Sequence, residues 1–206
     1  MTPPTRRDAA LASIIYLRDA IEGQIETLPL LKEYLHTQRN ASLRVLELGA
    51  GCGIVGIALS KLLSRCSVLL TDLPEVEDIV AYNLAAAKPS DSSTVRFQVI
   101  DWDEELPKDV QNDGVDLILV SDCTYNADSQ PALISVMSKL VRLSPNALVL
   151  VAMKRRHDSE AVFFNLMQSA EFSKLHEDSV LLPSQHNSHD RIELYIYGWP
   201  RRCSST

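Results

Sequence analysis

Glycine, cysteine and basic charge are all scarce in this sequence of 206 residues, and each shortage excludes a class of protein. Seven glycines are too few for a collagen-like repeat. Twenty basic against 27 acidic side chains leave a net charge of −7, which disfavours nucleic-acid binding by phosphate neutralisation. At 46% hydrophobic and 23% charged residues, the composition is that of a folded globular domain rather than a disordered tail.

The cysteines and the apolar runs exclude further classes. Cys52, Cys66, Cys123 and Cys203 are widely spaced and form no CxxC pair, so we expect free thiols and neither a metal site nor a disulfide framework. No apolar run reaches the roughly 18 residues that cross a bilayer, and no apolar signal core follows the first residues. We therefore expect a protein of the cytoplasm or nucleus that has no membrane partner.

Apolar periodicity predicts alternating helices and strands. Helical spacing is found over residues 8–38, with a break near Pro29, and over 54–63, 74–87, 131–143 and 159–169. Apolar runs predict strands at 44–48, 67–71, 95–100, 115–120 and 147–152, followed by an antiparallel hairpin from 180–182 and 192–197. The acidic stretch after the third strand is expected to be a turn. This order indicates an α/β fold in one domain, with a mostly parallel sheet between helices.

Four of the seven glycines fall in one loop directly after the first predicted strand. Gly51, Gly53 and Gly56 fit the GxGxxG pattern of dinucleotide-binding proteins, and Asp72 follows about 20 residues later. Counted from Glu47 instead, the pattern Glu-x-Gly-x-Gly-x-Gly is that of loops which bind S-adenosylmethionine (SAM). In both patterns, glycine lets a ligand approach the backbone where a strand turns into a helix.

The acidic residue ahead of the loop separates the two ligands. A pyrophosphate is repelled by a carboxylate at Glu47, whereas SAM carries an ammonium group and a sulfonium charge that a carboxylate attracts. Glu47 and the additional Gly49 therefore favour SAM over a dinucleotide. Asp72 suits either ligand, because its carboxylate can accept hydrogen bonds from ribose hydroxyls.

Two later strand ends carry further candidate residues. Asp101 and Trp102 follow the third strand, where the indole could pack on an adenine whose amino group bonds the carboxylate, or could simply cover the edge of the core. Asp122 follows the buried fourth strand directly. In open α/β sheets ligands bind at the carboxyl ends of the strands, so Asp122 is a candidate for chemistry.

Together these stretches resemble the family 16 group of seven-strand SAM-dependent methyltransferases, most of which are protein lysine methyltransferases. The matching residues are Val45–Gly53, Thr71–Leu73, Asp101–Trp102 and Asp122–Tyr125, the last similar to the group's D/E-x-x-Y/F signature. The similarity extends from about residue 42 to residue 199, the expected SAM-binding core, which an N-terminal helical segment (residues 1–40) precedes. It implies a seven-stranded sheet in the order 3-2-1-4-5-7-6 with a C-terminal antiparallel hairpin.

The resemblance also implies roles for single residues. Eight would contact the cofactor: Glu47, Gly49 and Gly51 at its methionine end, Asp72 at the ribose, Leu73, Asp101 and Trp102 around the adenine, and Ser121 nearby. Asp122 and Tyr125 would face the incoming amine as catalytic residues, with S-adenosylhomocysteine as the product.

The resemblance implies an N-methyltransferase whose partner is a protein presenting a lysine, and we expect a monomer. The family usually has an N-terminal segment, often with a Trp, that closes over the site, whereas residues 1–40 contain no Trp. A small-molecule N-methyltransferase and a non-catalytic interaction module with the same fold remain as alternatives. An NAD-dependent reductase is a third, although no Tyr-x-x-x-Lys pair is present.

Overall fold

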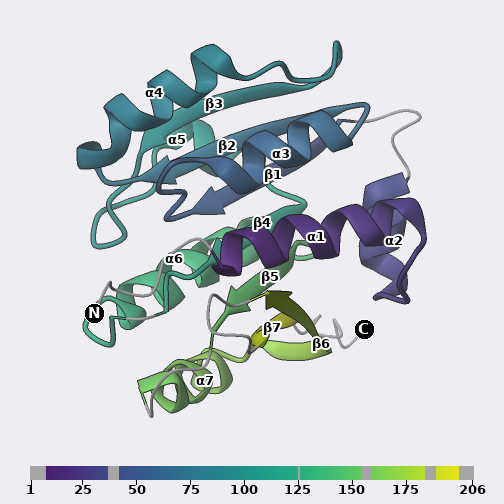
Figure 1. The fold of residues 1–206 in the computed structure, drawn as a ribbon. Helices are drawn as coiled ribbons and strands as arrows, with labels where there is room; N and C mark the ends of the chain where they lie inside the picture. The colour runs from purple at the N-terminus through teal and green to yellow at the C-terminus, as the bar shows by residue number, and fades with distance from the viewer. Residues whose placement is uncertain (1–7, 37–41, 125, 155–158, 184–188, 200–206) are drawn as a thin grey trace, which may run out of the picture.

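The computed structural model describes residues 8–36, 42–124, 126–154, 159–183 and 189–199. Among these residues, seven strands form one sheet in the order β3-β2-β1-β4-β5-β7-β6 (Figure 1). The strands are β1 (Leu43–Leu48), β2 (Cys66–Asp72), β3 (Thr94–Val99), β4 (Leu117–Ser121), β5 (Leu148–Met153), β6 (Ser173–Pro183) and β7 (His189–Gly198). The helices are α1 (Asp8–Glu22), α2 (Pro29–His36), α3 (Ile54–Leu62), the 3-10 turn η1 (Pro74–Val76), α4 (Glu77–Ala86), α5 (Lys108–Asp113), α6 (Gln130–Leu143) and α7 (Ser159–Ser169).

The pairing of the strands confirms the predicted fold class and strand order. β1 lies between β2 and β4 and pairs in parallel with both, and these two pair in parallel with their outer neighbours β3 and β5. β7 runs antiparallel between β5 and β6. β6 and β7 thus form the predicted antiparallel hairpin at the end of the sheet.

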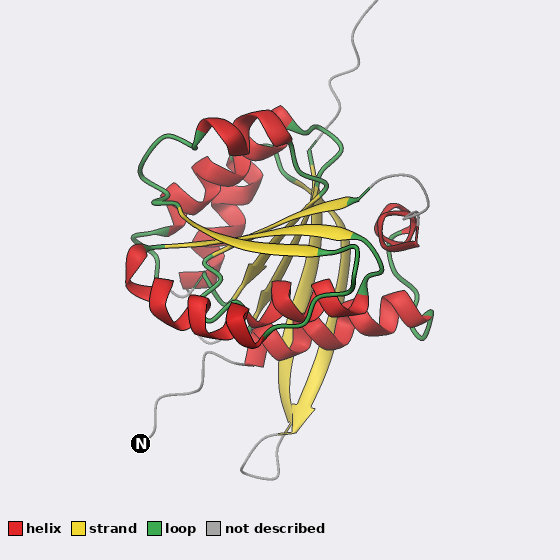
Figure 2. Cartoon of the chain, turned by 90° about the horizontal axis from the view of Figure 1, so that it is seen from above, coloured by secondary structure: helices red, strands yellow, loops and turns green. Residues whose placement is uncertain are grey.

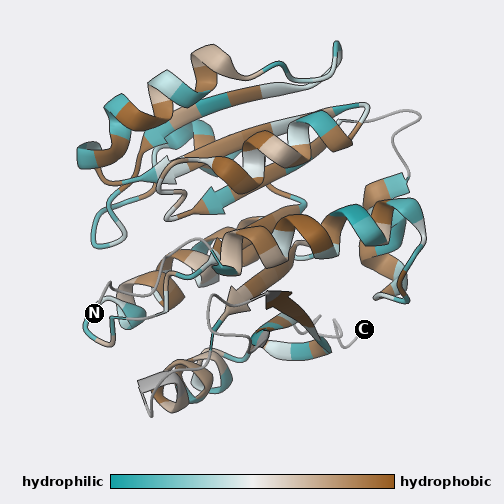
Figure 3. Cartoon of the chain, viewed as in Figure 1, coloured by the Kyte–Doolittle hydropathy of each residue, from teal (hydrophilic) through white to brown (hydrophobic). Residues whose placement is uncertain are grey.

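Helices cover both faces of the sheet because its central strands are apolar on both sides (Figures 2 and 3). Val45 of β1 packs toward the layer that contains α1, α2, α3 and α4. Its neighbours Leu46 and Leu48 pack toward the opposite layer, which contains α5, α6 and α7. Two hydrophobic clusters thus stabilise the sheet. None of the helices in the described ranges is long and apolar enough to cross a membrane.

Two elements differ from the sequence-based expectation. Residues 108–113, expected to be part of an acidic turn, form the short helix α5, in which Val110 is the buried residue. One buried side chain in six residues leaves no apolar periodicity for a sequence to reveal. β6 begins at Ser173 rather than near Val180, because its first half is a polar edge strand that pairs with β7 along its length.

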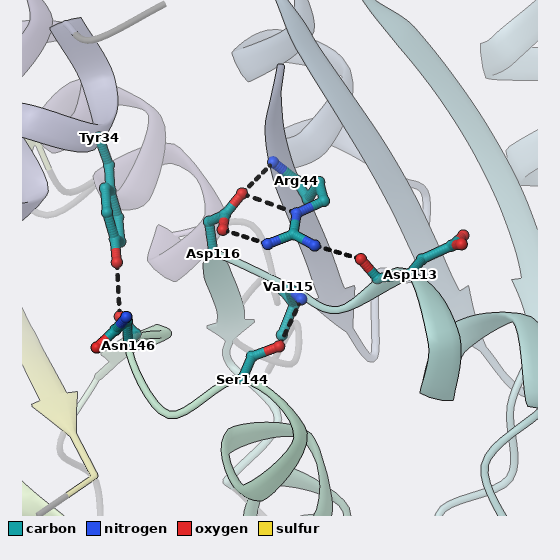
Figure 4. A network of polar contacts seen from close by, with 7 residues as sticks. All are labelled: Tyr34, Arg44, Asp113, Val115, Asp116, Ser144 and Asn146. Atoms are coloured by element: carbon teal, nitrogen blue, oxygen red, sulfur yellow. Dashed lines mark hydrogen bonds and ion pairs between the residues drawn. The ribbon is translucent and has the colours of Figure 1, made fainter. Parts of the chain in front are cut away.

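A polar network holds the amino ends of β1 and β4 together (Figure 4). The Arg44 guanidinium donates to both carboxylate oxygens of Asp116, at 3.1 and 2.7 Å, and to the carbonyl oxygen of Asp113. Nearby, the Val115 N–H donates to the Ser144 hydroxyl at 2.8 Å. The bidentate ion pair fixes the ends of these strands opposite the edge where the candidate residues lie.

Candidate functional site

The register of the parallel strands brings the predicted residues to one edge of the sheet. Leu48, the last residue of β1, pairs with Thr71 of β2 and with Val120 of β4. The next residues, Gly49, Asp72 and Ser121, therefore follow at nearly the same level. This edge, formed by the carboxyl ends of β1 to β5, is called the carboxyl edge below, and it is where open α/β sheets bind ligands.

Gly49 and Gly51 both have left-handed backbone conformations, with φ of 65° and 55°, but their surroundings differ. A Cβ atom at Gly49 would lie 2.6 Å from the Cys123 sulfur, whereas a Cβ at Gly51 would meet nothing within 4 Å. The Gly51 N–H donates to Asp72 Oδ2 at 2.7 Å. The loop therefore leaves room for a ligand at Gly51, beside the Asp72 carboxylate, but none at Gly49.

Glu47 is a buried carboxyl group beneath the loop. Its side chain is on β1, the residue is 2% exposed, and Oε2 accepts a hydrogen bond from the Gly56 N–H of α3 at 2.8 Å. Burial raises the pKa of Glu47 to about 8, and the nearby charge of Asp72 adds to this shift. The group is therefore largely protonated at neutral pH in the chain alone, and a cation nearby would favour its ionised form.

Cys123 occupies the space between these groups, and sequence reasoning did not single it out as a site residue. Its thiol lies 3.2 Å from the carbonyl oxygen of Leu48. Burial raises the pKa of this thiol, and the charges of Asp72, Glu47 and Asp122 raise it further. Such a thiol stays protonated and is no nucleophile. It fills the space under Gly49, a packing role that no sequence motif indicates.

Trp102 and Leu73 lie in the loops that follow β3 and β2. The Trp102 ring would be 3.2 Å from a Cβ at Gly49, so the end of β3 contacts the glycine loop. Leu73 is 45% exposed, and its N–H donates to Asp72 Oδ1 at 2.8 Å. Asp101 accepts from the N–H of Asp103 at 3.0 Å, which shapes the turn after β3.

Asp122 lies directly after β4 in a strained conformation. Its φ of 59° is uncommon for any residue but glycine, and Asp tolerates it better than most. The Asp122 N–H donates to the carbonyl oxygen of Ala152 in β5 at 3.0 Å, and the residue is only 8% exposed. Strained residues of this kind concentrate at functional sites. Tyr125, the second predicted catalytic residue, lies outside the described residues.

Helix α1 also reaches this edge, which sequence reasoning missed. Ser13 Oγ is 2.9 Å from Ser121 Oγ, although the two residues are 108 positions apart. Lys154, just after β5, lies 2.5 Å from Asp190 Oδ2 and 3.5 Å from Asp8 Oδ2. Serines and lysines at helix or strand ends occur throughout soluble proteins, so these contacts had no sequence signature.

The assembled site is acidic. Glu47, Asp72 and Asp122 all lie near the Cys123 sulfur, since the charge of each affects its pKa. Within the ranges that the structure describes, no group of His, Cys, Asp and Glu side chains is placed to hold a metal ion. A cavity of about 330 Å³ lies elsewhere, lined by Arg44, Ser67 and Arg96 near the amino ends of β1, β2 and β3. The geometry at the carboxyl edge suits an organic cation that contacts the backbone at Gly51.

The raised pKa of Glu47 predicts a specific pH dependence of stability. Between about pH 4.5 and 8 the unfolded chain ionises this group while the folded chain keeps it protonated, so the free energy of unfolding falls as pH rises. Glu47→Gln keeps the acceptor for Gly56 but removes this loss. In urea unfolding at pH 5, 6, 7 and 8, the free energy of unfolding of the variant should rise relative to that of the original chain by up to about 1.4 kcal/mol per pH unit. Glu33→Gln, on the exposed face of α2, is the control. If the free energy of unfolding of Glu47→Gln has the same pH dependence as that of the original chain, the raised pKa of Glu47 is contradicted.

Comparison with known proteins adds independent information. Residues 7–170 match the sequence model of the lysine methyltransferase family, a range that begins one residue before α1. The N-lysine methyltransferase METTL21A of Danio rerio is 31% identical over 66% of this chain and 61% of its own length. The protein-lysine N-methyltransferase EFM6 of Saccharomyces cerevisiae is 27% identical over 64% of this chain and 60% of its own.

Solved structures share the fold. A SAM-dependent methyltransferase from Methanosarcina mazei superposes with a TM-score of 0.61 at 12% identity, covering 85% of this chain and 99% of that one. The chain spans between 36% and 61% of the length of the first curated relatives that it matches. The family match nevertheless covers most of this sequence, from α1 through α7. Because of that match, the chain belongs to the lysine methyltransferase family.

Proposed function

We propose that this chain transfers a methyl group from SAM to the side-chain amine of a lysine in a protein substrate. The observation that carries the proposal is the buried carboxylate Asp122, which lies on the carboxyl edge that also holds the open backbone at Gly51 and the carboxylate of Asp72. The relatives named protein-lysine N-methyltransferases support a lysine amine as the acceptor.

The residues of the edge fit SAM in charge, and Gly51 leaves open space beside its backbone. Gly51 presents bare backbone to open space, and Asp72 beside it offers carboxylate oxygens to ribose hydroxyls. Leu73, Asp101 and Trp102, at the ends of β2 and β3, would border the adenine. When bound, SAM supplies a methyl group on a positively charged sulfur, which the acidic surroundings of Glu47 would favour.

Asp122 would act on the acceptor amine. Displacement at a methyl carbon needs little covalent help, so the main task of the chain is to align the amine at roughly 3–3.5 Å from that carbon. A carboxylate that accepts a hydrogen bond from the amine holds it in place and stabilises the positive charge that develops on nitrogen. The backbone hydrogen bond from Asp122 to Ala152 keeps the carboxylate at the level of the strand ends.

Tyr125 remains a prediction as the aromatic wall of the lysine channel. It is the third residue after Asp122 in the sequence. An aromatic face there would contact a methylated ammonium by a cation–π interaction. Ser121, which touches α1 through Ser13, would lie between the cofactor and the acceptor.

Two measurements test the proposed function. Isothermal titration should show binding of SAM and none of NADH, because a cation stabilises the ionised form of Glu47 beneath the glycine loop and a pyrophosphate does not. Incubation with tritiated SAM and a cell lysate should then label a protein band, and blocking the lysines of the lysate beforehand should abolish the label. If only small molecules are labelled, the chain is a small-molecule methyltransferase instead. If SAM binds but nothing is labelled, the chain is a non-catalytic module. Binding of NADH would favour a reductase.

The two open glycines of the chain give a matched test of the cofactor position. Gly51 and Gly23 both have positive φ, and at both a Cβ atom would meet nothing within 4 Å, but Gly23 lies in the loop between α1 and α2. Alanine at either position should cost about 1–2 kcal/mol in stability, measured by urea unfolding, because of the left-handed backbone. Only Gly51→Ala should weaken SAM binding, by at least about tenfold. Equal affinities for the two variants would exclude Gly51 from the cofactor site.

Replacement of Asp122 separates catalysis from binding. Asn tolerates the left-handed backbone as Asp does, so Asp122→Asn removes the charge with little effect on the turn. We expect label transfer to fall about a hundredfold or more, as when one group that stabilises transition-state charge is lost. SAM affinity should stay within about threefold. Asp91→Asn, in the exposed turn before β3, is the control, and full activity of Asp122→Asn would refute the role.

A further inference from the structure

Helix α1 lies across the sheet beside α3, and its first turn is at the carboxyl edge. It contacts β4, β5, β6 and β7 as well as α3, and Figure 1 shows its first turn on the same side as the arrowheads of β1 and β2. Small residues, among them Ala9, Ala12 and Ser13, form the buried face of its N-terminal half. These short side chains let the helix backbone approach the strands closely.

The direction of the hydrogen bonds shows how α1 contacts the site. The Ser13 hydroxyl donates its one proton to the carbonyl oxygen of Ala9 at 2.9 Å. In the contact between Ser13 and Ser121, the proton must therefore come from Ser121. Ser121 directly precedes Asp122, so α1 accepts a hydrogen bond from the residue that begins the strained turn.

A second contact is ionic and largely covered. Lys154 lies between Asp8, in the first turn of α1, and Asp190 of β7, with side-chain exposures of 18%, 23% and 33%. The three residues are called the Lys154 cluster below. Replacing the lysine with an apolar residue would remove the cation between two carboxylates in a partly buried site, which costs more than breaking an exposed ion pair.

The Lys154 cluster and Asp122 are connected through β5. The Asp122 N–H bonds Ala152 of that strand, two residues before Lys154. Asp122 is therefore held from two sides: by the backbone of β5, and through Ser121 by α1, whose first turn the Lys154 cluster attaches to β5 and β7.

We propose that Lys154 is a positioning residue for the amine site: by holding Asp8 and Asp190 together it seats α1 on the carboxyl edge, so that Ser13 and Ser121 keep Asp122 aligned. This inference rests on the proposed methyl transfer. Lys154 is engaged by Asp8 and Asp190, so it is assigned a positioning role and no contact with the reacting atoms. It acts on the substrate side of the edge, since α1 contacts β4 and β5, the strands that end just before Asp122 and Lys154, whereas the adenine would lie at the ends of β2 and β3.

The test compares Lys154→Met with Lys154→Arg and with Lys174→Met. Lys174 forms an ion pair of the same length, 2.5 Å, with Glu177, but both side chains are about half exposed. Two properties are measured for each variant: hydrogen exchange of residues 8–15 against the internal reference α4, and label transfer from tritiated SAM to lysate protein, analysed as apparent kcat and KM for SAM.

For Lys154→Met we expect at least tenfold faster exchange of residues 8–15, unchanged exchange of α4, and a kcat at least tenfold lower with a KM for SAM within threefold. Lys154→Arg should restore kcat to within threefold, because a guanidinium can bond both carboxylates. Lys174→Met should match the original chain.

If the original chain is active, two results for Lys154→Met would overturn the inference. One is a kcat within twofold of that of the original chain. The other is a loss of stability throughout the molecule with a normal kcat per folded protein. An original chain that transfers no label to protein would instead overturn the proposed function.

Discussion

The structure depends on the parallel register that places the ends of β1, β2 and β4 at one level. Hydrogen bonding between strands fixes that register, and the side chains on the two faces of the sheet specify it, because a slip of one residue would move each side chain to the opposite face and into the other hydrophobic cluster. Residues from three distant parts of the sequence, Gly49, Asp72 and Ser121, become neighbours only as a consequence. The Arg44–Asp116 ion pair at the opposite end supports the same alignment of β1 with β4.

Charge is distributed along this edge in two separate arrangements. Beside the glycine loop, Glu47, Asp72 and Asp122 approach one another around a protonated thiol, a concentration of acidic groups that a cationic ligand would relieve. Beside α1, the carboxylates of Asp8 and Asp190 already have their cation in Lys154. The first arrangement is suited to binding a cation, because the described residues place no positive charge of their own among these acidic groups. The second is suited to holding α1 in place, because Lys154 supplies that charge.

The sequence predicted the fold to a large extent, because strand and helix periodicities are local properties. The sheet order and the hairpin of β6 and β7 agree with the expectation, and so does membership of the methyltransferase family. Helix α5 was missed because it buries one side chain, and the first half of β6 because an edge strand need not be apolar. The contact between Ser13 and Ser121 was beyond sequence reasoning, since it depends on how a helix and a sheet pack rather than on any pattern. The assigned roles of Glu47, Asp72 and Asp122 stay predictions, as does that of Tyr125.

The position of α1 has a consequence for how the protein is made. This helix is synthesised before the strands β5, β6 and β7, against which its buried face packs, and Asp8 meets Asp190 through Lys154 only after most of the chain has been added. At about 5–20 residues per second, α1 can pack on α3 early, but its contacts with the last hairpin form on the order of 10–40 seconds after the helix is made. Its buried face includes the hydrophobic residues Tyr16 and Leu17, so part of the hydrophobic surface of α1 stays uncovered in the nascent chain until the last hairpin is made.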